Sequence, residues 1–160
     1  MRHAQAAFTF LELIVVLLLM GTLAALALPK MNTDGFRAAT EAQRLASAIR
    51  YAQALAMTKN ARHVVELTAP RSYVFRTAAG VQVTDPFSGT SASTQSLDSS
   101  VSYGSFVGVL SSIIGFDGRG TPYTNSPLTA TTVQLQVPVT IGSSTRTVTV
   151  DPETGWVAVQ

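Results

Sequence analysis

FTFLELIVVLLLMGTLAALAL, residues 8–28, is the stretch from which the fold of this chain follows. At about 1.5 Å per residue, a helix of this length spans about 30 Å, the hydrocarbon thickness of a bilayer, so we expect a transmembrane helix. Pro29 and Lys30 come directly after it and mark its end. Glu12 is its only charged residue. A carboxylate inside a bilayer costs about 2–3 kcal/mol or more, which makes Glu12 a candidate functional residue.

The residues before this stretch, MRHAQAA (residues 1–7), form a short polar leader. A secretory signal peptide has an apolar stretch of about 7–15 residues, with small residues at a cleavage site after it. Here the apolar stretch is longer, and the small residues Ala6 and Ala7 come before it. That order predicts cleavage on the cytoplasmic side of the membrane, which leaves the apolar helix as the mature N-terminus. An uncleaved signal anchor is the alternative.

Residues 7–12, AFTFLE, resemble the class III signal of type IV prepilins and type II secretion pseudopilins. In that family a prepilin peptidase cuts before a phenylalanine and N-methylates it, a glutamate is the fifth mature residue, and a proline at the twenty-second kinks the helix. Glu12 and Pro29 take these two places when Phe8 is counted as the first. The resemblance therefore implies cleavage between Ala7 and Phe8, methylation of Phe8, subunit assembly through Glu12 and a helix kink at Pro29. Ala7 stands where the family usually has glycine.

An assembly role fits the position of Glu12. Cleavage would create an amine at Phe8, and methylation keeps that amine charged. The ammonium of a neighbouring subunit then pairs with the Glu12 carboxylate, which eases the burial of both charges and favours one axial stagger between subunits. One alternative is that Glu12 reaches the membrane interface and pairs with nothing. Another is an unrelated membrane-anchored domain in which the match at Glu12 is accidental.

Residues 29–60 continue the helix with an amphipathic pattern. Pro29 removes one helical hydrogen bond, and the polar residues among 32–35 extend the weak point, so we expect a bend or a local end there. Apolar residues then recur at helical spacing: Leu45, Ala48, Ile49, Ala52, Leu55 and Ala56. The helix should end near Lys59 and Asn60.

Charged residues mark a second face of this helix. Arg37, Glu41 and Arg44 are spaced so that they can pair across one turn. The plain interpretation is a solvated face that contributes little stability. In a filament the same charges would instead meet neighbouring subunits.

From about residue 61 the period of the apolar residues changes from 3.6 to 2, which indicates a β-rich domain over residues 61–160. The expected strands are a hairpin of residues 62–68 and 72–77, a short third strand at 82–84, and a C-terminal antiparallel meander of residues 132–139, 146–150 and 156–159. In the first strand of the meander Val133, Leu135, Val137 and Val139 alternate with other residues, which predicts one buried face. Pro138 indicates that its strand lies at a sheet edge at that point.

Residues 85–105 are rich in serine, threonine, glycine and aspartate, which predicts a variable loop. Phe87 and Leu97 are the expected points of attachment to the core. A second interpretation is a partner-binding loop. The apolar segment 107–116 follows, and a turn at residues 117–122 ends it.

A long helix followed by antiparallel strands predicts an α+β fold. The helix, transmembrane over 8–28 and amphipathic over 29–60, would pack on an antiparallel β-sheet or two-sheet domain. This is the pilin fold that the resemblance implies. Residues 116–120 (FDGRG) and 154–157 (TGWV) are similar to those of the GspH/FimT minor subunits.

The resemblance also implies a function and a location. The expectation is a minor pilin or pseudopilin, anchored by a single pass in the bacterial inner membrane with its globular domain in the periplasm, and then assembled into a type II secretion pseudopilus or a type IV pilus. Its expected partners are other pilin subunits, the prepilin peptidase, the inner-membrane assembly platform and membrane lipid. The alternative is a minor pilin displayed at a filament tip, where it binds DNA or a surface.

The sequence gives little support for an enzymatic or ligand-binding function. There is no cysteine, and no nucleophile–base pattern or phosphate loop, so we expect neither an enzyme nor a cofactor. Asp117, Asp151 and Glu153 are oxygen ligands of the kind that calcium prefers. All three lie in turns, where aspartate is common for backbone reasons, so we expect no metal site.

DNA binding is possible but not the leading expectation. The formal net charge is +2, with 11 Lys and Arg against 9 Asp and Glu. Phosphate binding needs clustered cations. The arginines of the β-rich domain are scattered along the sequence, at positions 62, 71, 76, 119 and 146.

Overall fold

The computed structural model describes residues 9–27, 33–84, 89, 94–124 and 129–160. The chain divides into two compact units, Met1–Thr33 and Asp34–Gln160. Ala7, Phe8, Pro29 and Phe87 lie outside the described residues, so the predictions that rest on them are not addressed by the structure. Over the described ranges, no helix combines the length and the apolar character needed to cross a bilayer.

The first unit contains helix α1 (Phe10–Ala27). Thr9 caps its start: the Glu12 amide donates to the Thr9 hydroxyl at 3.2 Å and to the Thr9 carbonyl at 3.1 Å. This arrangement satisfies an amide that the first helical turn would otherwise leave without a partner. The predicted apolar helix is therefore present, with bounds a few residues inside residues 8–28.

The second unit begins with helix α2 (Asp34–Lys59). Asp34 and Gly35 were expected in the weak patch after Pro29, but they are the first helical residues. An acidic side chain in the first turn is favourable because it faces the positive end of the helix dipole. The predicted end of the helix is confirmed: it stops at Lys59, and Asn60 has a positive φ of 46°.

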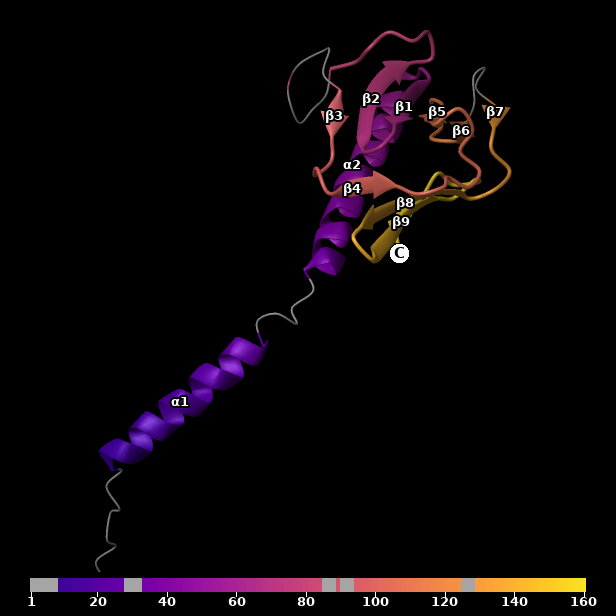
Figure 1. The fold of residues 1–160 in the computed structure, drawn as a ribbon. Helices are drawn as coiled ribbons and strands as arrows, with labels where there is room; N and C mark the ends of the chain where they lie inside the picture. The colour runs from indigo at the N-terminus through magenta and orange to yellow at the C-terminus, as the bar shows by residue number, and fades with distance from the viewer. Residues whose placement is uncertain (1–8, 28–32, 85–88, 90–93, 125–128) are drawn as a thin grey trace, which may run out of the picture. The chain divides into compact units, whose positions relative to one another are not determined.

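In the described part of the second unit, ten strands form two antiparallel sheets beside α2 (Figure 1). The first sheet has the order β3-β2-β1-β5-β6-β7, and its strands are β1 (His63–Thr68), β2 (Ser72–Thr77), β3 (Gln95–Ser96), β5 (Ile113–Phe116), β6 (Pro122–Thr124) and β7 (Thr129–Ala130). The second sheet has the order β10-β9-β8-β4, and its strands are β4 (Val101–Tyr103), β8 (Leu135–Ile141), β9 (Ser144–Val150) and β10 (Val157–Val159). The predicted hairpin β1–β2 and the predicted C-terminal meander are both confirmed.

The core lies between α2 and both sheets. Figure 1 shows β8 and β9 beside the N-terminal part of α2, with β1 and β2 beside its C-terminal part. Six of the eight buried residues of α2 are alanines, which lets the helix backbone approach the strands closely. The strands supply the bulk of the core side chains, including Phe75, Ile114 and Phe116. Tyr51 and Tyr73 both contact the Phe75 ring edge-on.

Several predictions for the β-rich domain were wrong. The third strand expected at residues 82–84 is only an isolated bridge between Arg76 and Gln82, and the strand that pairs with β2 is β3. The predicted loop of residues 85–105 therefore contains β3 and β4. Leu97 is buried between them, as expected of an attachment point. These strands have only two and three residues, too few for an alternating pattern to appear.

The β8 strand begins later than predicted. Leu135, Val137 and Val139 are buried as expected, but Val133 precedes the strand and is 54% exposed. β8 lies between β9 and β4 rather than at an edge. Pro138 nevertheless lies one residue beyond the Tyr103–Val139 pair that ends the β4 ladder, so its missing amide interrupts no ladder hydrogen bond there.

Candidate functional site

Glu12 lies in the first turn of α1 and is exposed. Thr9 and Glu12 have the Thr-x-x-Glu spacing of a capping box, and the Thr9 half of that motif is formed. This capping role of Thr9 was not predicted, although the Thr-x-x-Glu spacing alone indicates it. The cap fixes the start of the helix, and therefore the height of the Glu12 carboxylate along it.

The side chains of α1 beyond Glu12 are apolar on every side of the helix. Leu11, Leu17, Leu18 and Leu23 are each more than 60% exposed. A helix that is apolar all round is normally buried on all sides, in a protein core or in a membrane. Within the first unit nothing covers these described side chains, so α1 has the surface of a helix that is buried by something outside this unit.

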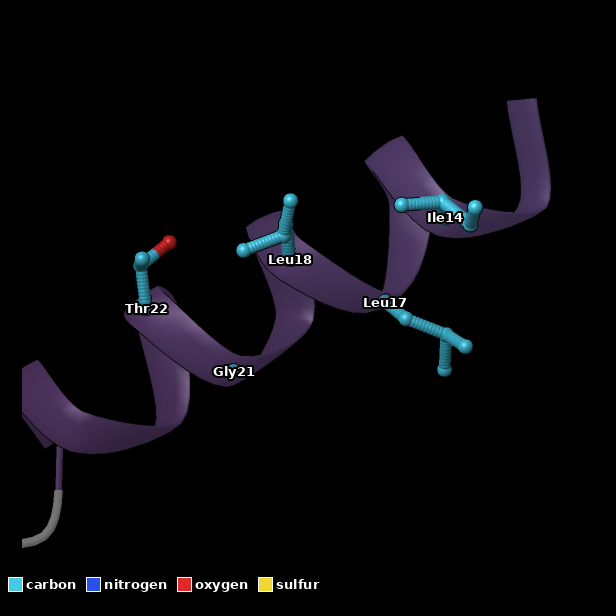
Figure 2. A pocket seen from close by; sticks show the side chains of 5 residues that line it. All are labelled: Ile14, Leu17, Leu18, Gly21 and Thr22. Atoms are coloured by element: carbon cyan, nitrogen blue, oxygen red, sulfur yellow. The ribbon is translucent and has the colours of Figure 1, made fainter. Parts of the chain in front are cut away.

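One side of α1 carries a shallow apolar groove lined by Ile14, Leu17, Leu18, Gly21 and Thr22. Figure 2 shows the side chains of Ile14, Leu18 and Thr22 on one side of the helix, with Leu17 pointing away from them. The Thr22 hydroxyl donates to the Leu19 carbonyl at 2.9 Å, so the one hydroxyl in the groove is satisfied by its own helix. A Cβ added at Gly21 would meet no atom within 4 Å, which leaves room for close approach by another helix.

A polar network ties the N-terminal half of α2 to the β3–β4 segment. Arg37 Nη2 donates to Asp98 Oδ1 at 3.0 Å and to Ser100 Oγ at 3.1 Å. Glu41 Oε2 accepts the Asp98 amide at 3.1 Å and lies 3.8 Å from Arg44 Nη1. The pairing of Glu41 with Arg44 across one turn was predicted, whereas Arg37 pairs with Asp98 instead.

The network holds Asp98 in its charged form. Hydrogen bonds from the Ser100 hydroxyl at 2.5 Å and the Ser100 amide at 2.8 Å, with a smaller contribution from Arg37, lower the pKa of Asp98 to about 2. A carboxyl group whose pKa is lower in the folded state adds stability that is present above its unfolded pKa and is lost as the pH falls through its folded pKa.

We therefore expect Asp98→Asn to unfold at lower urea concentration than the wild type at neutral pH. The difference should shrink as the pH is lowered from about 4 to about 2, because the wild-type carboxylate is protonated over that range. Urea unfolding of both proteins across this range measures the effect. A difference that stays constant down to about pH 2 would show that the loss comes from packing and not from the charge.

Residues 116–120 and 154–157, which are similar to those of the GspH/FimT subunits, meet at one side chain of α2. Gln53 Nε2 donates to the Gly120 carbonyl at 3.2 Å. A Cβ added at Gly155 would lie 2.5 Å from the same Gln53 nitrogen, and Gly155 has a positive φ of 68°. Glycine is therefore required at Gly155 both for its conformation and for the close approach of the two turns.

The acidic residues considered as calcium ligands hold these turns together. Asp117 Oδ1 accepts the amides of Arg119 and Thr121 at 2.9 and 3.0 Å. Burial raises the pKa of Asp117, but these hydrogen bonds, with one from the Tyr123 hydroxyl, outweigh it and leave the pKa below its usual value.

Asp151 has the same role in the second turn. Its Oδ1 accepts the Thr154 amide and hydroxyl, each at 2.8 Å, and these two bonds lower its pKa. In the part of the chain that the structure describes, no three His, Asp or Glu side chains come close enough together to hold a metal ion.

Comparison with known proteins assigns the chain to a family. The sequence model described as "Type II transport protein GspH" matches residues 41–155, and that of the prokaryotic N-terminal methylation motif matches residues 2–28. No curated protein sequence matches the chain.

Two solved structures share the fold, both of the type IV minor pilin FimU of Pseudomonas aeruginosa. The crystal structure in space group P21 has a TM-score of 0.52 at 12% identity and covers 77% of this chain and 87% of FimU. The one in space group P65 has a TM-score of 0.51 at 13% identity, with coverage of 76% and 90%. At these identities the likeness establishes the pilin fold.

The fold, the methylation motif and the family match agree on one kind of protein. It is a minor pilin or pseudopilin, a structural subunit that is processed at its N-terminus and assembled with other pilin subunits into a pilus or pseudopilus. Because the family model spans most of the chain, this protein belongs to the GspH family.

Proposed function

We propose that this protein is a minor pseudopilin of a type II secretion system. Residues 8–28 would cross the bacterial inner membrane once, and the unit Asp34–Gln160 would lie in the periplasm. Prepilin peptidase would cut between Ala7 and Phe8 and methylate Phe8. The inner-membrane assembly platform would then extract the subunit from membrane lipid into a pseudopilus.

The surface of α1 supports the membrane anchor and the filament, and the match to the family described as "Type II transport protein GspH" supports the choice of machine. The leucines of α1 whose side chains the structure describes are largely exposed, and Glu12 is the only charged residue in the helix. Burying one such leucine side chain is worth about 1.5–3 kcal/mol, so leaving all of them in water is untenable. Lipid covers this apolar surface before assembly, and the helices of neighbouring subunits cover it afterwards.

Glu12 would set the position of the subunit in the filament. The mature amine at Phe8 is four residues before Glu12, so the amine of one subunit reaches the carboxylate of its neighbour when the two are displaced along the filament axis. Burying either charge alone is costly, whereas the pair with its hydrogen bonds removes much of that penalty. Pro29 would allow the helix to bend between the membrane unit and the periplasmic unit.

We do not extend the proposal to DNA. Binding of phosphates would need several free cations on one surface. In the described part of the unit Asp34–Gln160, Arg37 pairs with Asp98, Arg44 with Glu41 and Arg76 with Glu66. The other arginines of the β-rich domain, at positions 62, 71, 119 and 146, are scattered along the sequence.

Deletion of the chain in its own host tests the assignment of the machine. We expect loss of secreted exoproteins from the culture medium, with surface pili intact, and recovery on return of the wild-type sequence. Loss of pili with normal secretion would instead place the subunit in a type IV pilus. Normal secretion and normal pili would contradict both assignments.

We expect Ala7→Gly to speed processing, because glycine is the residue that the family usually presents to the peptidase at this position. Pulse-labelling of the chain together with the peptidase would measure the fraction cut at successive times. Ala6→Gly is the matched control and should leave the rate unchanged. Equal rates for Ala7→Gly and the wild type would show that this peptidase accepts both residues equally.

A further inference from the structure

The second sheet has an outer face that points away from α2. Leu135, Val137, Val148 and Val150 point to α2 and are buried. Because side chains alternate along a strand, the residues between them point away from α2. The register pairs Gln136 with Thr149, Pro138 with Thr147 and Thr140 with Thr145 on this outer face, and Thr149 with Ala158 on β10. Thr149 itself is buried, so the accessible hydroxyls are those of Thr140, Thr145 and Thr147.

This outer face carries hydroxyls and amides but no charged side chain along β8, β9 and β10. The Thr140 and Thr145 hydroxyls lie 3.0 Å apart, and Gln136 Nε2 donates to Gln134 Oε1 at 3.1 Å. Each hydroxyl oxygen keeps capacity to accept or donate a further hydrogen bond. Asp151 follows β9, and its carboxylate accepts hydrogen bonds from Thr154 and Glu153 of its own turn. The Asp34 carboxylate lies at the other end of the hairpin, where a Cβ added at Gly142 would clash with Asp34 Oδ2.

Trp156 stands at the end of this face and is 70% exposed. Trp156 lies one residue before β10, but the hydrogen bond from the Asp151 amide to its carbonyl continues the Val157–Val150 register, so side-chain alternation places it on the outer side with Ala158. Its backbone is fixed: its amide donates to Thr154 Oγ1 at 3.2 Å, and its carbonyl accepts the Asp151 amide at 2.9 Å. A turn with a fixed backbone therefore presents a large aromatic ring to solvent.

We propose that this outer face binds a neutral polysaccharide, with a sugar ring stacked on Trp156 and the sugar hydroxyls bonded to Thr140, Thr147 and Gln136. A sugar ring offers an apolar face of C–H groups to an aromatic ring and a rim of hydroxyls to uncharged donors and acceptors. Anionic polymers, including peptidoglycan with its carboxylate-bearing peptides, are a poor match because the described residues of this face supply no cation. A flat sheet also suits an extended chain better than a compact ligand.

The lone tryptophan makes binding directly observable. The sequence contains a single Trp, so its emission reports only on this face. Full-length protein in a zwitterionic detergent without a sugar headgroup would be titrated with cellohexaose, chitohexaose and soluble peptidoglycan fragments. We expect a saturable change in emission with at least one of the two neutral oligosaccharides and none with the peptidoglycan fragments.

Variants are compared by affinity electrophoresis in gels that contain the polymer of the oligosaccharide that binds. Trp156→Ala should lose at least about tenfold in affinity, corresponding to about 1.4 kcal/mol. Thr147→Val, which keeps the shape and removes one hydroxyl, should weaken binding less. Phe36→Ala is the matched control, because Phe36 is 78% exposed on α2 and not on this face. Trp156→Tyr keeps an aromatic ring and should retain most of the binding. This result would show that the loss in Trp156→Ala comes from the missing ring and not from a folding defect.

Three outcomes would overturn the proposal: no saturable change with either neutral oligosaccharide, equal losses in Trp156→Ala and Phe36→Ala, or an emission change only on adding a purified partner pseudopilin. The last result would make this face a contact between subunits.

Discussion

Replacement of Glu12 by alanine is expected to remove this chain from assembled filaments while leaving its amount in the membrane unchanged. The substitution would remove the carboxylate that pairs with the amine of the neighbouring subunit, and that amine would then be buried without a countercharge. Breaking a buried pair by removing one partner typically costs about 3–5 kcal/mol, so we expect filament-associated protein to fall by about a hundredfold or more. Immunoblotting of sheared or cross-linked filaments and of the membrane fraction would measure the ratio of filament-associated to membrane-associated protein.

Two further variants show whether the charge is responsible. Glu12→Gln keeps the size of the side chain and should fail as Glu12→Ala does, because an amide cannot pair with an ammonium as a carboxylate does. Thr22→Val removes a polar group from the same helix, and its hydroxyl bonds only to the Leu19 carbonyl, so it should assemble normally. Normal incorporation of Glu12→Ala would refute the pairing of Glu12 with Phe8.

Substitution of Gly155 by alanine should destabilise the β-rich unit by about 3 kcal/mol. A side chain at a positive φ costs about 1–2 kcal/mol, and overpacking a tight contact adds about 1–3 kcal/mol. At Gly155 both apply, since its φ is 68° and a Cβ would lie 2.5 Å from Gln53 Nε2. The corresponding fall in melting temperature is about 10 °C.

Gly80 offers a matched control for this prediction. It has a similar φ of 82°, but a Cβ there would meet no atom within 4 Å. Gly80→Ala should therefore cost only the conformational part, about 1 kcal/mol. Thermal unfolding of the two variants and the wild type in the same detergent separates the cost of the backbone conformation from the cost of the steric contact. Equal losses at Gly80 and Gly155 would mean that the contact between the two turns and Gln53 contributes little.

The elements that could be predicted are those with a long periodic pattern. The apolar helix, the amphipathic helix and the strands of the hairpin and meander each extend over enough residues for their period to be visible. β3 and β4 could not be predicted, because two or three residues show no period and their pairing depends on partners distant in sequence. Val133 was misplaced since a regular alternation continued past the true start of the strand.

The candidate site follows the same rule. Glu12 could be identified because its environment is local: an apolar stretch, a leader before it and a proline after it. Thr9 was available from the spacing of a capping box. The Arg37–Asp98 pair joins residues 61 positions apart, and nothing in either neighbourhood indicates the other. Trp156 could be read as a strand residue, but only the register of three strands shows that it ends an uncharged surface.

The mature N-terminus tests the central claim most directly, since the whole assembly role of Glu12 depends on an amine at Phe8. Mass spectrometry of the N-terminal peptide from protein purified out of its host membrane would identify it. We expect a peptide that begins at Phe8 and carries one N-methyl group. A peptide that begins at Met1, or at any residue other than Phe8, would contradict it.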